Sequence, residues 1–149
     1  MQDYKIEKLS QNNLSQVAKI DKECFGDNSW SYSLYLDELS DPQKYYKVAC
    51  DKAKVIGYGG FSHIIDEAHI MNIAVTSSYR SKGVGSLILN SLIQQARDLK
   101  IKAMTLEVNQ NNIIAIDFYK KNDFEIKGIR PKYYSNKDSA LILWRFLEE

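Results

Sequence analysis

Apolar and polar residues follow two different spacings along this chain, and these spacings predict a mixture of strands and helices. Alternation every second residue, or a short apolar run between turn residues, predicts strands at 4–9, 45–50, 55–65, 68–75, 104–108, 124–129 and 140–146. Apolar positions three and four residues apart predict helices at 14–25, 31–39, 83–99 and 112–122. The order β-α-α-β-β-β-α-β-α-β-β indicates an α/β chain with a mixed sheet, in which three successive antiparallel strands span residues 45 to 75.

The clearest helix and the clearest strand are neighbours in the sequence. In the segment 83–99, apolar side chains at helical spacing are Leu89, Leu92, Ile93, Ala96 and Leu99. In the strand that follows, Met104, Leu106 and Val108 alternate with polar residues. Successive side chains of a strand point to opposite faces, so these three face a core while Glu107 points the other way.

Composition and charge describe an ordinary globular chain and exclude several classes of function. The 149 residues include 20 Lys and Arg against 19 Asp and Glu, and a net charge of +1 argues against direct nucleic-acid binding. This length is typical of one domain, so we expect a single domain over residues 1–149. No segment has the unbroken apolar run of a signal peptide or a membrane span. A cytoplasmic protein is therefore expected.

The two cysteines and two histidines do not indicate a metal site or a disulfide framework. Cys24 and Cys50 show no CxxC or Cys/His spacing. Both lie among apolar residues, so we expect them in the core of a reduced protein. His63 and His69 have no evident third ligand, and no metal is expected.

The strongest chemical signal is a basic, glycine-containing turn between a predicted strand and the most regular helix. Residues 73–75 end the strand, and Arg80, Lys82, Gly83 and Gly85 lie at the start of the helix. Such a turn brings unpaired backbone N–H groups and the positive end of a helix dipole together, which favours an anion. Its glycines allow a diphosphate to approach the backbone closely. Taken alone, the segment fits a plain glycine turn with solvated basic side chains equally well.

This turn resembles the pyrophosphate loop of the GNAT N-acetyltransferase superfamily, and further segments extend the resemblance over nearly the whole chain. The segments that carry it are Asp66-Glu67-Ala68-His69-Ile70-Met71-Asn72-Ile73-Ala74-Val75, Arg80-x-x-Gly83-x-Gly85, Leu106-Glu107-Val108, Asn112 with Ala115 and Tyr119, and Arg130-x-Lys132-Tyr133-Tyr134. Together they resemble the RimI family, bacterial N-alpha-acetyltransferases that acetylate the N-terminal alanine of a small-subunit ribosomal protein. The resemblance implies a GNAT fold, a mixed, mostly antiparallel seven-stranded sheet flanked by four helices with a splayed central strand pair.

The resemblance also implies a role for each matching residue. The backbone groups that would hold the acetyl and pantetheine portions of acetyl-CoA, the expected cosubstrate, belong to Ile73, Ala74 and Val75. The other residues implied in cofactor binding are Arg80, Ser81, Lys82, Gly83, Val84, Gly85, Ser86 and Asn112. Glu107 would accept a proton and Tyr119 would donate one. The residues implied to contact the acceptor, an N-terminal peptide of a ribosomal protein, are Trp30, Tyr133 and Tyr134.

The chemistry of the side chains supports the two catalytic assignments independently. An α-amino group has a pKa of about 8, so a carboxylate such as Glu107 removes its proton more easily than that of a lysine side chain. A tyrosine hydroxyl such as that of Tyr119 can donate to a leaving thiolate, and a backbone N–H near Val75 can stabilise charge on the carbonyl oxygen. Taken singly, Glu107 is better explained as a solvated carboxylate and Tyr119 as a core aromatic. Their occurrence with the basic turn, in the family's order, favours catalysis.

The chain departs from the family pattern at three places. The proline that is common before Trp30 is absent, although Ser31, which we expect to cap the next helix, is kept. Asn109 replaces a frequent basic residue, and Asp123 replaces a glycine where a left-handed turn is expected. None of these departures lies in the cofactor loop or the acid–base pair.

Together these patterns predict an acetyl-CoA-dependent N-alpha-acetyltransferase that modifies the N-terminal alanine of a ribosomal protein by direct transfer. A monomer without a metal or a membrane partner is expected. Lysine side chains and small amines are alternative acceptors within the same enzyme class. From other classes, a non-catalytic acyl-CoA-binding module stays open, and a nucleotide-binding domain is disfavoured because the chain lacks a Walker lysine.

Overall fold

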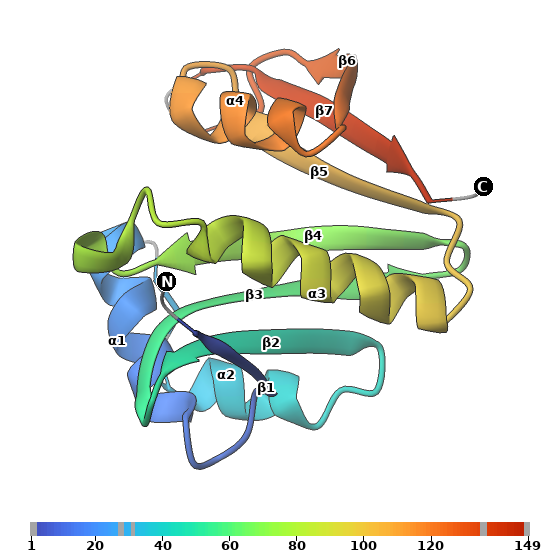
Figure 1. Ribbon diagram of the computed structural model, residues 1–149. Helices are drawn as coiled ribbons and strands as arrows, with labels where there is room; N and C mark the ends of the chain where they lie inside the picture. Colours follow the sequence, from blue (N-terminus) through green and yellow to red (C-terminus); the bar gives the residue numbers. More distant parts are fainter. Residues whose placement is uncertain (1–2, 27–28, 31, 135–136, 148–149) are drawn as a thin grey trace.

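A seven-stranded sheet forms the centre of the computed structural model, which describes residues 3–26, 29–30, 32–134 and 137–147 (Figure 1). Its strands are β1 (Lys5–Lys8), β2 (Lys44–Asp51), β3 (Lys54–Ile64), β4 (Glu67–Val75), β5 (Ala103–Asn109), β6 (Glu125–Arg130) and β7 (Ala140–Phe146). Their spatial order is β1-β2-β3-β4-β5-β7-β6. The β4–β5 pair is parallel and the other neighbouring strands are antiparallel. The predicted mixed, mostly antiparallel sheet is confirmed.

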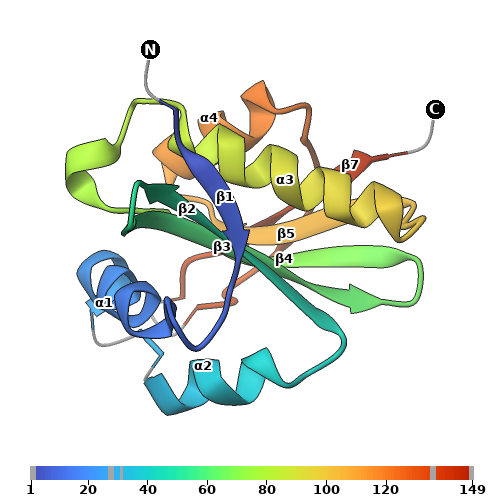
Figure 2. The ribbon, with the colours of Figure 1, turned by 60° about the horizontal axis from the view of Figure 1, so that its bottom comes forward.

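Helices cover both faces of this sheet. In the described part of the chain the four α-helices are α1 (Leu14–Phe25), α2 (Tyr32–Leu39), α3 (Val84–Asp98) and α4 (Ile113–Lys121). Figure 2 shows α1 and α2 on one side of the sheet and α3 and α4 on the other. The element order is as predicted, except for a short 3-10 helix, η2 (Ser77–Tyr79), after β4. No helix among the described residues combines the length and the apolar character needed to cross a membrane.

Each face of the sheet has its own core. Leu92 of α3 and Tyr119 of α4 are buried in one core, while Val17 of α1 and Tyr35 of α2 are buried in the other. Along β5, the residues on either side of Glu107 are buried, whereas Glu107 itself is exposed. Its predicted direction, away from the core, is therefore confirmed.

The central strands β4 and β5 pair at one end only. Their parallel register joins residues 67–69 of β4 to residues 103–105 of β5. Beyond this point the two ribbons diverge, as Figure 1 shows. The predicted splay of the central pair is confirmed, and it leaves residues 70–75 of β4 without a described strand on their β5 side.

Helix α3 packs closely on β3 because two glycines leave room for Ile88. A Cβ on Gly59 would lie 2.8 Å from Cγ2 of Ile88 and 3.1 Å from Cγ1 of Ile73. A Cβ on Gly57 would lie 2.9 Å from Cδ1 of Ile88. Carbon atoms in favourable contact are roughly 3.5–4.0 Å apart, so either methyl group would overlap its neighbours. The glycines of β3 therefore set the distance between α3 and the sheet.

We expect Gly59→Ala to lower the free energy of unfolding by about 2 kcal/mol, because the added methyl group overpacks the core between β3 and α3. Urea unfolding followed by circular dichroism measures the change. Gly128→Ala in β6 is a matched control, because its Cβ would lie 3.4 Å from the nearest atom, Cδ1 of Ile142. Equal losses in the two variants would show that packing against Ile88 is not the cause.

Three local expectations have different outcomes. Asp123 has a φ of 69°, so the expected left-handed turn after α4 is confirmed. Cys50 is buried as expected, but the expectation that Cys24 lies in the core is wrong, because this residue is only half-buried. Cys24 lies in the last turn of α1 at the margin of the core, where its thiol faces the carbonyl oxygen of Val75 at 3.7 Å. Ser31, the expected helix cap, lies outside the described residues.

Candidate active site

Backbone groups at the end of β4 are directed toward the diverging strand β5. The N–H of Thr76 donates to the carbonyl oxygen of Ile56 at 2.9 Å, which sets the phase of the β3–β4 ladder. In an antiparallel ladder, the N–H and C=O groups of every second residue bond to the same neighbouring strand. Because Thr76 bonds to β3, the N–H and C=O groups of Ile73 and Val75 point away from β3. The resemblance implies that these groups hold the acetyl and pantetheine portions of the cofactor. The N–H and C=O groups of Ala74, which lies between Ile73 and Val75, point toward β3 and pair with it.

The turn that leads into α3 has the geometry of an anion site. Ser81 and Gly83 have left-handed backbone angles, with φ of 62° and 82°. The N–H of Leu87 donates to the carbonyl oxygen of Gly83 at 3.0 Å, so the N–H groups of residues 84–86 precede the first helical hydrogen bond. A Cβ on Gly83 would meet no atom within 4 Å, and the first turn of α3 contains no acidic residue. These features fit the diphosphate of an acyl-CoA.

The two basic side chains of this turn are placed differently. Arg80 folds back onto the end of β4, where its Nε donates to the carbonyl oxygen of Val75 at 3.0 Å. Its Nη2 lies 3.3 Å from the sulfur of Cys24. Lys82 is exposed to solvent. Arg80 therefore connects the turn with β4 and α1, a structural contact that the sequence pattern does not reveal.

A carboxylate from α1 holds the segment just after β4. Glu23 accepts hydrogen bonds from Oγ1 of Thr76 and from the N–H of Ser77, both at 2.8 Å. These hydrogen bonds, that from Thr76 first, lower the pKa of Glu23. Nothing in the sequence marks the contact, because Glu23 and Thr76 are 53 residues apart.

Gly85, implied to admit a diphosphate, also has a packing role. A Cβ at this position would lie 3.2 Å from Cε1 of Phe118 on α4. Its neighbour Val84 is buried and Ser86 is half-buried. Of the two glycines in the turn, Gly83 therefore faces open space, while Gly85 sets the contact between α3 and α4.

Glu107 extends from β5 on the face that α3 and α4 do not cover. Its Oε2 lies 2.6 Å from Nε of Arg130, the last residue of β6. The side chains are 32% and 58% exposed, so both can be reached by a ligand. In the sequence Arg130 is only one residue of a family segment, and its contact with Glu107 depends on how the strands pair.

Tyr119 and Asn112 belong to α4 and its N-terminal end. Tyr119 is 8% exposed, and its ring centroid lies 5.1 Å from that of Phe118 and 5.4 Å from that of Phe124. The hydroxyl of Tyr119 is protonated at neutral pH, as in any ordinary tyrosine, and burial raises its pKa further. Asn112 caps the helix, because its Oδ1 accepts from the N–H of Ala115 at 3.2 Å.

The three residues implied to contact the acceptor lie in two places. Tyr133 and Tyr134 follow β6, and their ring centroids are 5.1 Å apart. The pKa of Tyr134 is raised by burial first, then by Tyr133 and by the charge of Glu107. Trp30 instead packs against Tyr35, with ring centroids 5.3 Å apart, in the core beneath α1 and α2.

A buried polar network holds the backbone at Trp30. Asp21 is 1% exposed, and it accepts hydrogen bonds from the hydroxyl of Tyr58 and, at 2.6 Å, from the N–H of Trp30. The hydroxyl of Tyr35 donates to that of Tyr58 at 3.0 Å. Burial is the main cause that raises the pKa of both tyrosines. The only sequence signal for this network is the high tyrosine content, ten residues in all.

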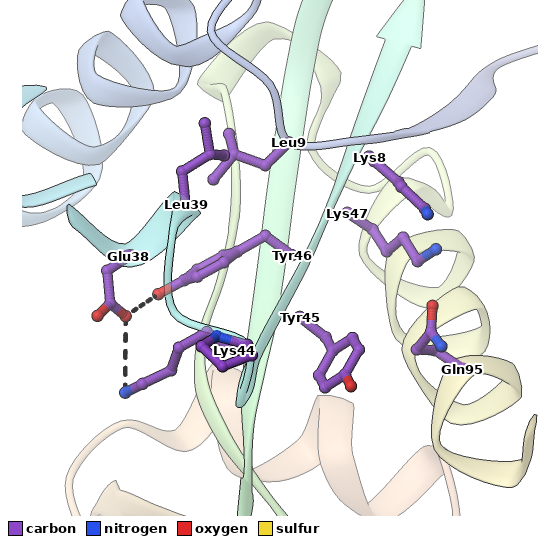
Figure 3. Close-up of a pocket in the computed structure, with 10 residues that line it drawn as sticks. Lys8, Leu9, Glu38, Leu39, Lys44, Tyr45, Tyr46, Lys47 and Gln95 are labelled. Atoms are coloured by element: carbon purple, nitrogen blue, oxygen red, sulfur yellow. Dashed lines mark hydrogen bonds and ion pairs between the residues drawn. The ribbon is translucent and has the colours of Figure 1, made fainter. Parts of the chain in front are cut away.

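Two cavities are formed by described residues, and neither is lined by a residue of β4 or by Glu107. The first, of about 290 Å³, is bounded by β1, β2, α2 and α3 (Figure 3). Figure 3 shows that Glu38 faces both Tyr46, whose hydroxyl donates to it at 2.7 Å, and Lys44 at 3.6 Å. The second, of about 810 Å³, is lined by α1 and Trp30. Glu23 also lines the second cavity, which therefore lies beside the segment just after β4.

The sequence matches a known protein family over most of its length. The sequence pattern of the Acetyltransferase (GNAT) family matches residues 14–124. A Bacillus subtilis protein provisionally named as a ribosomal protein bS18-alanine N-acetyltransferase is 28% identical over 145 residues, which cover 97% of this chain and 96% of that protein. The similarity thus extends along almost the full length of both chains.

Solved structures share the fold. The ribosomal-protein-S18-alanine N-acetyltransferase of Escherichia coli superposes with a TM-score of 0.87 and 23% identity, covering 99% of this chain and 96% of that one. A Bacillus anthracis protein, provisionally a streptothricin acetyltransferase and solved with acetyl coenzyme A, superposes with a TM-score of 0.82 and 22% identity over 97% and 99% of the two chains. Because the sequence match spans most of a chain with this fold, the protein belongs to the GNAT acetyltransferase family, which uses acetyl-CoA.

Proposed function

We propose that this chain transfers the acetyl group of acetyl-CoA to the α-amino group of a ribosomal protein that begins with alanine. The observation that carries the proposal is the open side of β4, where Ile73 and Val75 direct their polar groups next to the donor-rich turn at Gly83. The names of the Bacillus subtilis and Escherichia coli relatives support the choice of acceptor.

The acetyl donor would be held by backbone groups at two points. Acetyl-CoA supplies a thioester, which is an activated acetyl group. The N–H groups of residues 81–86 would bind its diphosphate, and the exposed charge of Lys82 would strengthen that contact. The N–H of Val75 would stabilise negative charge on a carbonyl oxygen. Asn112, at the start of α4, would also contact acetyl-CoA.

Proton transfer would depend on one carboxylate and one hydroxyl. Glu107, exposed on β5 and close to Tyr134, would accept the proton of the acceptor amine. Tyr119, whose hydroxyl is protonated at neutral pH, would donate a proton to the leaving sulfur. The amine attacks directly, so no nucleophilic side chain is needed.

The acceptor peptide would lie over the uncovered face of β5, beside the rings that follow β6. Tyr133 is 52% exposed and offers a broad apolar surface to a peptide. Trp30 would contact the peptide from the side of α1 and α2, and Asp21 holds its backbone in place.

A panel of acceptors tests this proposal. A peptide with the N-terminal sequence of bS18, the same peptide with a blocked N-terminus and a free lysine, and spermidine are each incubated with the protein and acetyl-CoA, and thiol release is measured. We expect release with the free N-terminus alone. Release with the blocked peptide or with spermidine would identify a lysine or small-amine acceptor instead. Binding of acetyl-CoA without release from any acceptor would identify a binding module.

We expect Tyr119→Phe to lower kcat by about 100-fold, because the proton donor is lost while the ring keeps its packing. Steady-state kinetics should show a KM for acetyl-CoA within about twofold of the parent value. Tyr32→Phe is the control, because Tyr32 is 45% exposed on α2. An unchanged kcat with a raised KM for acetyl-CoA would assign Tyr119 to cofactor packing instead.

A further inference from the structure

The candidate base Glu107 already has a cationic partner in the protein itself. The Oε2 of Glu107 lies 2.6 Å from the Nε of Arg130, which makes the two side chains a close ion pair. The acceptor of the proposed reaction is also a cation while its amine is protonated. The guanidinium and the amine therefore compete for the same carboxylate.

Strand pairing explains how two residues on different strands meet. Glu107 of β5 lies opposite Ile142 of β7, and Arg130 of β6 lies opposite Ala140 of β7. Because residues 140 and 142 are two apart on one strand, their side chains point to the same face of the sheet. The small side chain of Ala140 lets the long side chain of Arg130 pass over β7 to reach Glu107.

Arg130 has a second partner besides the carboxylate. Its Cζ lies 5.9 Å from the ring centroid of Tyr133, within the range of a cation–π contact. The segment that carries this ring is held to the sheet, because the N–H of Tyr134 donates to the carbonyl oxygen of Asp138 at 3.2 Å. Asn109 of β5 donates from Nδ2 to Oδ2 of the same Asp138 at 3.1 Å.

We propose that Arg130 is a positioning residue that occupies Glu107 in the free enzyme and yields it to the protonated amine of the acceptor. The inference rests on the proposed function. Once the amine is acetylated it has no charge, so the product no longer competes, and Arg130 returns to Glu107 after the carboxyl group has released the accepted proton to solvent. The pair therefore weakens the binding of a free N-terminus and leaves the binding of an acetylated one unchanged.

The test compares one peptide in two states. A peptide with the N-terminal sequence of bS18 and its Nα-acetylated copy are titrated calorimetrically into the parent protein and into Arg130→Gln, in the presence of CoA. We expect the free-amine peptide to bind Arg130→Gln about threefold more tightly, the size of effect that an exposed ion pair produces, and the acetylated copy to bind both proteins equally. Arg130→Lys, which keeps a cation, should restore the parent ratio.

A matched control and the contrary outcomes keep the test decisive. Lys127→Gln removes another exposed cation of β6, one that pairs with Glu125 at 3.3 Å, and it should change neither affinity. Equal changes in affinity for the two peptides in Arg130→Gln, or weaker binding of the free-amine peptide, would overturn the role of Arg130. The proposed function would still be supported in that case if the parent protein acetylates the free-amine peptide. Failure of the parent protein to acetylate the free-amine peptide would overturn both.

Discussion

Glu107→Gln is expected to lower kcat for peptide acetylation by about 100-fold or more, because the amide cannot accept the proton of the attacking amine. The substitution keeps the size of the side chain and its exposed position on β5, so the fold should be unaffected. The loss should be greatest below the amine pKa of about 8, where most of the acceptor is protonated. Steady-state rates measured between about pH 6 and pH 9 would show this trend.

A neighbouring carboxylate provides the control for this variant. Glu125 is exposed on β6 and pairs with Lys127 at 3.3 Å, so Glu125→Gln removes a similar charge from the same half of the sheet. It should leave kcat unchanged. If Glu107→Gln matched the parent protein over the whole pH range, the base assignment would be wrong.

Asp21→Ala is expected to lower the free energy of unfolding by about 3 kcal/mol, because two buried donors lose their acceptor. These donors are the hydroxyl of Tyr58 and the N–H of Trp30, which meet the two carboxylate oxygens separately. Asp21→Asn keeps one acceptor oxygen and should lose about half as much. Urea unfolding of the three proteins measures both differences.

Two further variants identify the cause of this loss. Asp117→Ala removes an exposed aspartate from α4 and should change stability by less than about 0.5 kcal/mol. In Tyr58→Phe the hydroxyl is already absent, so adding Asp21→Ala should cost less than the sum of the single losses. Strict additivity would mean that Asp21 does not act through Tyr58.

Local patterns were sufficient to predict the elements of the fold. The helical spacing of Leu89, Leu92 and Ile93 and the alternation around Glu107 reflect which side of each element is buried, and burial follows from local sequence. The 3-10 helix at Ser77–Tyr79 carries no such pattern, because its three residues bury no side chain. It is held by Glu23 from a distant helix.

The candidate site was predictable only where its residues belong to one continuous segment. The turn from Arg80 to Gly85 joins a strand to a helix, so its anion-binding geometry follows from the sequence order. The pairing of Glu107 with Arg130 depends on β7, which follows both residues in the chain and lies between their strands. Likewise, the half-buried position of Cys24 depends on where α1 meets the end of β4.

The short pairing of β4 with β5 has a mechanical consequence. It divides the sheet into two hydrogen-bonded blocks, β1-β2-β3-β4 and β5-β7-β6, which are joined by strand pairing only at residues 67–69 and 103–105. Along residues 70–75 of β4 no described ladder joins the two blocks. The contact between Phe118 of α4 and Gly85 of α3 limits how closely these two helices approach each other. On the face covered by α3 and α4, one continuous core that contains Ala68 of β4 and Leu106 of β5 holds the two blocks together.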